Sequence, residues 1–226
     1  MTTIAHISDL HFDRVDPAAV RALPAELHSF RPDVVIISGD LTQRARRGQY
    51  RRAVEFISRL PSPRIIVPGN HDVPLFDSLR RMIDPYGRFA RKVSADFFPE
   101  FRNDDVHIVG INTACRLAPR WNGFWKDGKI RPIHLDELRR RLPPGLVRPG
   151  QMRMLVAHHP FIEPPGGHVH GIIHGAARAL PVLESLGIDL ILGGHFHLSF
   201  HGDLRARYAN LSRPMLNLVA GSATST

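Results

Sequence analysis

The chain has 226 residues, of which 43% are hydrophobic and 23% charged, a balance that is typical of globular domains and excludes disordered, collagen-like and membrane-protein compositions. Its formal net charge of +9 comes mostly from arginine and indicates attraction to anionic partners. Aromatic residues are not interleaved with the arginine clusters, so nucleic acid is not expected among those partners.

The predicted elements alternate between short apolar strands and longer amphipathic helices, which is the order of a single α/β domain over residues 1–226. Most strands are continuous apolar runs, as expected where both faces of a strand are covered. Residues 75–102 are expected to form a further helical segment, and residues 163–170 a loop rich in Pro and Gly. In chain order, the strands are expected over residues 3–8, 34–38, 64–67, 106–112, 152–157, 190–192 and 215–219, and the helices over residues 17–29, 49–60, 134–142 and 175–186.

Two arginine clusters fall on or beside these predicted helices. Clusters of this kind are usually solvated helix faces, and that interpretation is preferred. The alternative is a scaffold that recruits acidic partners through its charge. One cluster contains Arg44, Arg46, Arg47, Arg51 and Arg52, and the other contains residues 139–141.

The N-terminal sequence and the cysteine content bear on the cellular location and on the possible metal ligands. The first predicted strand begins a few residues after Met1, which leaves no room for a signal peptide, and no apolar run is long enough to span a bilayer. A cytoplasmic location without membrane contact is therefore expected. Because Cys115 is the single cysteine, any metal site must be built from histidines and carboxylates.

Polar residues follow several of the predicted strands at the point where each strand ends. In open α/β sheets, ligands bind in the crevice outside the carboxyl ends of the strands. Five separate segments are therefore expected to bring polar side chains to one edge. They are Asp9-Leu10-His11, Gly39-Asp40, Gly69-Asn70-His71-Asp72, His158-His159-Pro160 and Gly193-Gly194-His195-Phe196-His197.

The residue types in these segments are those of a transition-metal site. Asp9 and His11 are two residues apart, so in extended backbone they project to the same side and can hold one ion, and His195 and His197 repeat this spacing. Imidazole, carboxylate and amide ligands suit Mn, Fe, Co, Ni or Zn better than calcium. The segments carry more ligands than one metal needs. They predict two ions roughly 3.5–4 Å apart, bridged by a carboxylate and suited to in-line displacement at phosphorus.

Each motif has an ordinary structural interpretation when it is taken alone. Gly-Asp is a common turn, and a single histidine more often satisfies a structural hydrogen bond than binds a metal. Five such motifs after five strands are much harder to explain without a shared site.

In this order the motifs resemble those of the calcineurin-like metallophosphoesterase superfamily. The resemblance extends from residue 4 to residue 222 and is closer still to the bacterial class III cyclic-nucleotide phosphodiesterase branch. It implies a sandwich of two mainly mixed β-sheets flanked by helices, with the metal site at the C-terminal ends of the strands. The matching segments are residues 7–12, 39–43, 68–72, 158–160 and 194–197.

The resemblance also implies a division of the ligands between two divalent cations, for which Mn or Fe is favoured and Zn, Co or Ni are alternatives. His158 is preferred to His159 as a ligand because related sequences carry His-x-Pro at this place. His159 would then lie behind the ligands or contact substrate. The first ion would be held by Asp9, His11 and His197, the second by Asn70, His158 and His195, and Asp40 would bridge them.

His71 is the residue expected to be catalytic without binding metal. By the resemblance, it would lie over the leaving oxygen and stabilise its charge or supply a proton. Asp72 is expected to orient the imidazole through its other nitrogen.

Two features depart from the related branch. Its members continue with further strands beyond the segment that resembles residues 220–225, so this domain is expected to lack C-terminal strands. The loop around residues 164–174 carries His168, His170 and His174. These histidines would either contact substrate or lie in solvent, and solvent is preferred because the Gly neighbours indicate mobility.

The predicted function is hydrolysis of a small phosphodiester, with a 3',5'-cyclic nucleotide favoured, by a hydroxide that two metals activate. A phosphoesterase or nuclease of the same superfamily with another substrate is an alternative. A catalytically silent phosphate-binding module is a second alternative, although His71, Asp72 and Asp40 are all present. The resemblance also leaves room for a homodimer.

Overall fold

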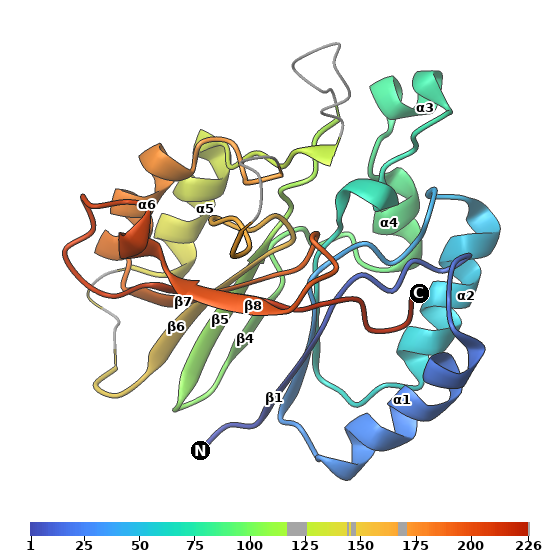
Figure 1. The fold of residues 1–226 in the computed structure, drawn as a ribbon, viewed down its shortest axis with the longest axis horizontal. Coiled ribbons are helices and arrows are strands. Elements are labelled where there is room, and N and C mark those ends of the chain that lie inside the picture. The colour runs from blue at the N-terminus through green and yellow to red at the C-terminus, as the bar shows by residue number, and fades with distance from the viewer. Residues whose placement is uncertain (117–125, 144, 146–147, 167–170, 226) are drawn as a thin grey trace.

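The computed structural model of the chain describes residues 1–116, 126–143, 145, 148–166 and 171–225. Its first sheet has three parallel strands in the order β1-β2-β3 (Figure 1). Residues on β2 alternate between two apolar clusters, since Val35 and Ile37 face one and Val34 and Ile36 the other. Burial on both faces explains why β2 is apolar throughout. The strands are β1 (Ile4–Ile7), β2 (Val34–Ile37) and β3 (Arg64–Ile66).

The second sheet has six strands in the order β4-β5-β6-β7-β9-β8. Its four central strands are parallel, and β4 and β8 pair antiparallel at the two edges. The α/β class and the two-sheet architecture are confirmed, although only this larger sheet is mixed. Its strands are β4 (Glu100–Arg102), β5 (Val106–Ile111), β6 (Met152–Ala157), β7 (Ile188–Gly193), β8 (Phe200–Asp203) and β9 (Leu216–Val219).

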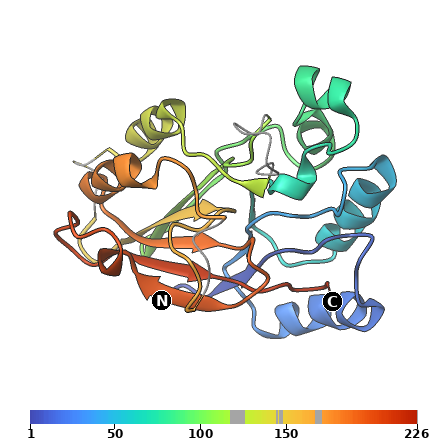
Figure 2. The ribbon, with the colours of Figure 1, turned by 45° about the horizontal axis from the view of Figure 1, so that its top comes forward.

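The two sheets pack against each other between two layers of helices (Figure 2). Ile36 of the first sheet meets Ile108 and Val156 of the second in one buried cluster. Helices α1 (Pro17–Ser29), α2 (Arg47–Ser58) and α4 (Gly87–Lys92) cover the outer face of the first sheet, and α5 (Pro132–Arg141) and α6 (Ala176–Ser185) cover that of the second. The short helix α3 (Ser78–Ile83) projects from the same end of the molecule as α4 (Figure 1). Among the described residues, no helix combines the length and the apolar character that a membrane crossing requires.

The seven predicted strands and four predicted helices are present, most with ends that differ by one or two residues. The strands β4 and β8 were not predicted. Both are short edge strands with polar sequences, Glu-Phe-Arg and Phe-His-Gly-Asp, so they lack the apolar run on which the strand predictions depend. The segment 75–102 contains the helices α3 and α4, as expected of a helical segment, but its last three residues form β4.

Strand β9 exposes apolar side chains and buries a polar one, the opposite of the usual pattern. Leu216 and Leu218 are 46% and 39% exposed, whereas Asn217 between them is fully buried. The side-chain oxygen of Asn217 accepts from the backbone N–H of Phe161 at 2.7 Å, and its Nδ2 donates to the carbonyl of Ile191 at 3.1 Å. Asn217 therefore fixes the chain just beyond His158-His159-Pro160 to the sheet.

Replacement of Asn217 by alanine should lower the free energy of unfolding by about 2 kcal/mol, because the buried N–H of Phe161 loses its acceptor. Urea denaturation of the purified protein measures this loss. Leu218→Ala, on the same strand but partly exposed, is the matched control and should cost less. Equal losses for the two variants would show that the buried hydrogen bonds contribute nothing beyond ordinary packing.

Candidate metal centre

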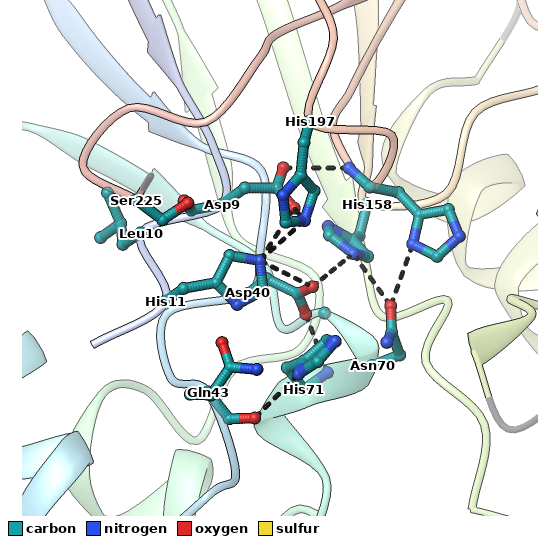
Figure 3. Close-up of polar contacts among 12 residues, drawn as sticks. Asp9, Leu10, His11, Asp40, Gln43, Asn70, His71, His158, His197 and Ser225 are labelled. Atoms are coloured by element: carbon teal, nitrogen blue, oxygen red, sulfur yellow. Dashed lines mark hydrogen bonds and ion pairs between the residues drawn. The ribbon is translucent and has the colours of Figure 1, made fainter. Parts of the chain in front are cut away.

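The side chains expected to bind metal come together where strands of both sheets end (Figure 3). Asp9 follows β1, Asp40 follows β2 and Asn70 opens the 3-10 turn Asn70–Asp72 after β3. From the second sheet, His158 follows β6 and the segment with His195 and His197 follows β7. The hydrogen bonds Asp9 N to Gly39 O and Gly194 N to His158 O, at 3.1 and 2.9 Å, join neighbouring strand ends.

One group of donor atoms belongs to Asp9, His11, Asp40 and His197, whose ligand atoms all lie within 4.8 Å of one another. The Nε2 atoms of His11 and His197 are 2.9 Å apart. The Asp9 Oδ1 lies 3.5 Å from the first of these nitrogens and 3.3 Å from the second. Two imidazoles and two carboxylates thus point at a common centre, which is the donor set of a borderline divalent cation.

A second group is formed by Asn70, His158 and His195. The amide oxygen of Asn70 lies 3.2 Å from His158 Nε2 and 3.0 Å from His195 Nδ1. Asp40 lies between the two groups, because its Oδ2 is 3.6 Å from His11 Nε2 and 3.4 Å from His158 Nε2. This placement fits a carboxylate that two ions share.

The hydrogen bonds of the adjacent histidines distinguish His158 from His159. His158 Nδ1 donates to the Ser38 carbonyl at 2.7 Å, which aims Nε2 at Asp40 and Asn70. The ligand atoms of His159 also lie within 4.8 Å of those of His158 and His195. Both ring nitrogens of His159 are occupied, however, since Thr113 donates to Nδ1 and Nε2 donates to the Lys126 carbonyl, each at 2.8 Å. These hydrogen bonds leave Nε2 of His158 directed at the site, whereas both nitrogens of His159 already have partners.

The backbone at the site is left-handed at several predicted ligands, a conformation uncommon outside glycine. The expectation that Asp9 and His11, and likewise His195 and His197, share a side through extended backbone is therefore wrong. Turned backbone brings Asp9 and His11 into one group of donor atoms instead, whereas His195 and His197 belong to different groups, which spacing alone does not reveal. The φ angles are 54° at Asp9, 47° at His11, 52° at Asp40, 78° at His195 and 58° at His197.

Two glycines allow the close approach of these turns. A Cβ on Gly69 would lie 2.1 Å from Asp40 Oδ1, and one on Gly194 would lie 1.9 Å from Ser8 Oγ and 2.4 Å from Asp9 Oδ2. Any side chain at either position would displace a carboxylate of the site.

His71 is oriented by a backbone carbonyl. Its Nδ1 donates to the Gln43 carbonyl at 2.8 Å, and its backbone N–H donates to Asp40 Oδ1 at 2.8 Å. The expectation that Asp72 orients the imidazole is therefore wrong. Gln43 lies in a segment that resembled the family, but a carbonyl contact carries no side-chain signal from which this role could be read.

Asp72 instead holds two loops together. Its carboxylate accepts from the backbone N–H groups of Leu41, Thr42 and Gly69 at 2.9–3.0 Å, and from the Thr42 hydroxyl at 3.1 Å. Burial and the nearby charge of Asp40 raise the pKa of Asp72 to about 6 despite these donors. Asp72 thus fixes the segment after β2 against the turn that carries His71.

The electrostatics of the site favour cations. Burial opposes the charge of Asp40, but the charge and hydrogen bond of His158 hold the pKa of Asp40 well below its usual value. Burial also opposes the charge of His158 and by itself would lower its pKa. The charge and hydrogen bond of Asp40 outweigh burial and raise the pKa of His158 to about 9. Asp9 Oδ1 is buried and accepts no hydrogen bond from the described residues. Divalent cations would satisfy this oxygen and balance the two carboxylates, so the donor set fits them.

A cavity of about 320 Å³ opens beside the first group of donor atoms. His11, His71 and His197 line it, together with three cationic side chains that were not assigned to the site from the sequence. Arg14 and Arg44 lie only a few residues after His11 and Asp40, but a long flexible side chain gives no sign in the sequence of where its charge will lie. The three cations are Arg14, Arg44 and Lys126.

Of the three loop histidines, His174 is the one that the structure describes. His168 and His170 lie outside the described residues. His174 is about half exposed and its Nε2 lies 3.1 Å from Asp127 Oδ2. It does not line the cavity, in agreement with the preferred interpretation that it faces solvent.

Comparison with known proteins gives a consistent result. The model of the calcineurin-like phosphoesterase family matches residues 2–199. A Synechococcus protein named as a probable cyclic nucleotide phosphodiesterase is 27% identical over 210 residues, which cover 88% of this chain and 74% of that protein. A protein of Arcobacter nitrofigilis named as a probable glycerophosphodiester phosphodiesterase is 25% identical over 170 residues, which cover 74% of this chain but only 57% of that protein.

Two solved structures share the fold at low sequence identity. A dimetal phosphatase from Danio rerio superposes with a TM-score of 0.68 at 14% identity, over 100% of this chain and 88% of that one. A purple acid phosphatase from yellow lupin superposes with a TM-score of 0.64 at 14% identity, over 99% of this chain and 44% of that one.

Replacement of Asp72 by asparagine should lower the free energy of unfolding by about 2 kcal/mol, because an NH₂ group would face backbone N–H donors in place of an oxygen. Urea denaturation in the presence of a chelator measures the loss without any contribution from bound metal. The exposed Asp104→Asn serves as the control and should change little. A stable Asp72→Asn variant would contradict the role of Asp72 in holding the two loops.

Metal content should follow the two groups of donor atoms. We expect two Mn²⁺ ions per chain in the loaded protein, and a melting temperature that falls on chelation because ions at a hundredfold excess over Kd stabilise the folded state by about 2.7 kcal/mol each. Asp40→Ala should bind less than one ion and show little change on chelation. Elemental analysis and thermal melting test both points, and full metal content in Asp40→Ala would exclude a shared carboxylate.

Proposed function

The chain belongs to the calcineurin-like phosphoesterase family and is a metal-dependent phosphoric ester hydrolase, and we propose that its substrate is a small phosphodiester, with a 3',5'-cyclic nucleotide favoured. The observation that carries this proposal is the cavity of about 320 Å³ beside the metal donors, lined by three cations. Its volume is in the range of small-molecule sites. The names of the relatives, which include a cyclic nucleotide and a glycerophosphodiester phosphodiesterase, support the same class of ester.

We assign one metal ion to each of the two groups of donor atoms. Two divalent ions in those positions would supply a nucleophile at neutral pH and a counter-charge for the phosphoryl oxygens. Mn and Fe are favoured, and Zn, Co or Ni suit the same mixture of nitrogen and oxygen donors. Asp9, His11 and His197 would hold the first ion, Asn70, His158 and His195 the second, and Asp40 both.

The other residues of the cavity would bind and orient the ester. Arg14 and Arg44 would donate to its non-bridging oxygens, since guanidinium groups match phosphate geometry. His71 would act on the leaving oxygen. Because Nδ1 donates to the Gln43 carbonyl, Nε2 would face the leaving oxygen, and it would supply a proton there only from the imidazolium form of His71. Burial lowers the pKa of His71, so this form would depend on the negative charge of the bound ester.

The architecture also supports a single domain. Ligands come from both sheets, and the two sheets share one buried cluster, so neither sheet forms the site alone. We propose that the exposed Leu216 and Leu218 of β9 mark the face on which additional strands would pack.

The role of His71 predicts a dependence on the leaving group. His71→Ala should lower kcat for 3',5'-cyclic AMP by about 10²–10⁴-fold, the usual contribution of a general acid. The loss should be much smaller for bis(p-nitrophenyl) phosphate, because p-nitrophenolate leaves without a proton. Steady-state kinetics of the Mn²⁺-loaded variant, with metal content checked, measures both. Equal losses on the two esters would indicate a structural role for His71.

The exposed His201→Ala of β8 is the matched control for His71→Ala and should keep full activity on both esters.

Substrate class is tested with the same Mn²⁺-loaded preparations. Cyclic AMP, glycerophosphoethanolamine and p-nitrophenyl phosphate represent the cyclic nucleotide, the alternative diester and a monoester. A kcat/KM highest for the monoester would overturn the phosphodiesterase proposal, and a loaded protein that cleaves none of the three would favour the silent phosphate-binding module.

A further inference from the structure

A second cavity, of about 540 Å³, lies between α2 and the segment that contains α3 and α4. It shares no lining residue with the cavity at the metal centre. Its cationic side chains come from three different helices, so it is more than the solvated face of one helix. The six cations are Arg47, Arg51, Arg80, Arg88, Arg91 and Lys92, and no Asp or Glu lines the cavity with them.

Most of this positive charge is not balanced within the protein. Arg80 pairs with Asp77 at 3.2 Å, and Arg91 pairs with Asp84 at 3.1 Å. Within the part of the chain that the structure describes, the other four cations of the cavity form no ion pair. Like charges gathered in one cavity repel one another, so a bound anion would stabilise the arrangement.

Arg88 lines the cavity and is partly buried. Its Nη1 donates to the Ala45 carbonyl at 2.6 Å, while its buried Nε has no acceptor among the described residues. Burial, followed by the charge of Arg80, lowers the pKa of Arg88. The hydrogen bond to Ala45 holds the guanidinium at the cavity wall beside the other cations, where its remaining N–H donors suit an anion.

The first turn of α2 adds to the same potential. Arg47 and Gly48 are its first two residues and both line the cavity. The positive end of the helix dipole and its unpaired N–H groups favour negative charge at this position.

We propose that this cavity binds a small anion with two or more phosphate groups. With Arg80 and Arg91 paired to carboxylates, the four other cations still exceed the charge of a single phosphate, and arginine forks match phosphate oxygens. The volume suits a small molecule. The one aromatic residue in the lining, Tyr50, is fully buried, so the cavity lacks the exposed rings on which nucleic acid bases stack. The site is separate from the proposed active site and does not depend on its substrate.

The test uses inorganic tripolyphosphate as the probe and the metal-loaded full chain. A buffer with excess Mg²⁺ saturates the chelating capacity of the probe before it meets the protein. Calorimetric titration compares the wild type with Arg47→Gln/Arg51→Gln, which removes two charges from the cavity without loss of an ion pair. The matched control is Arg21→Gln/Arg178→Gln, which removes two exposed helical arginines elsewhere and lowers the net charge equally.

We expect the cavity variant to weaken tripolyphosphate binding at least tenfold and the control variant less than twofold. Equal weakening in both variants would show attraction by net charge alone and would overturn the proposal. Unchanged binding in the cavity variant would place the probe at the metal centre and would also overturn the proposal. A single-stranded oligonucleotide that binds more tightly than tripolyphosphate, and is sensitive to the same substitutions, would replace the small anion by nucleic acid.

Discussion

The charge of Asp40 is the feature on which the rest of the site depends. A buried carboxylate is tolerated only where cations and hydrogen-bond donors surround it. His11 approaches it after β1 and His158 after β6, while the backbone N–H of His71 donates to it from the turn after β3. These groups come from both sheets, so the sheets must pack in one fixed relation. The apolar cluster between them, with Ile36 against Ile108, provides that relation.

The same constraint explains the backbone of the site. Left-handed residues other than glycine cost of the order of 1–3 kcal/mol each, and they persist where the surroundings fix them. Asp9 is fixed in this way, because its backbone N–H donates to Gly39, its Oδ2 accepts from the backbone N–H of His195, and the hydroxyl of Thr224 holds the next carbonyl, that of Leu10. The strain therefore belongs to the construction of the donor set rather than to an isolated loop.

The segment from Asp40 to Arg47 connects the metal centre with the arginine-lined cavity. It begins at the carboxylate between the two groups of donors, and Asp72 then holds it through the backbone of Leu41 and Thr42. Next, the Gln43 carbonyl orients His71. The segment ends at the arginine-lined cavity beside α2. The net charge of +9 is thus concentrated in part around two cavities on either side of one short segment.

The sequence by itself determined the α/β class, the main strands and helices, and the set of residues that meet at the strand ends, because apolar periodicity and polar motifs are local signals. It did not determine β4 or β8, whose polar sequences pair only because a neighbouring strand lies beside them. Nor did it determine the role of Asp72 or the carbonyl that orients His71, since backbone groups look alike in every sequence. The left-handed turns, the different hydrogen-bond partners of His158 and His159, and the gathering of arginines into cavities were decided by tertiary packing, which alone sets the distances between residues far apart in the chain.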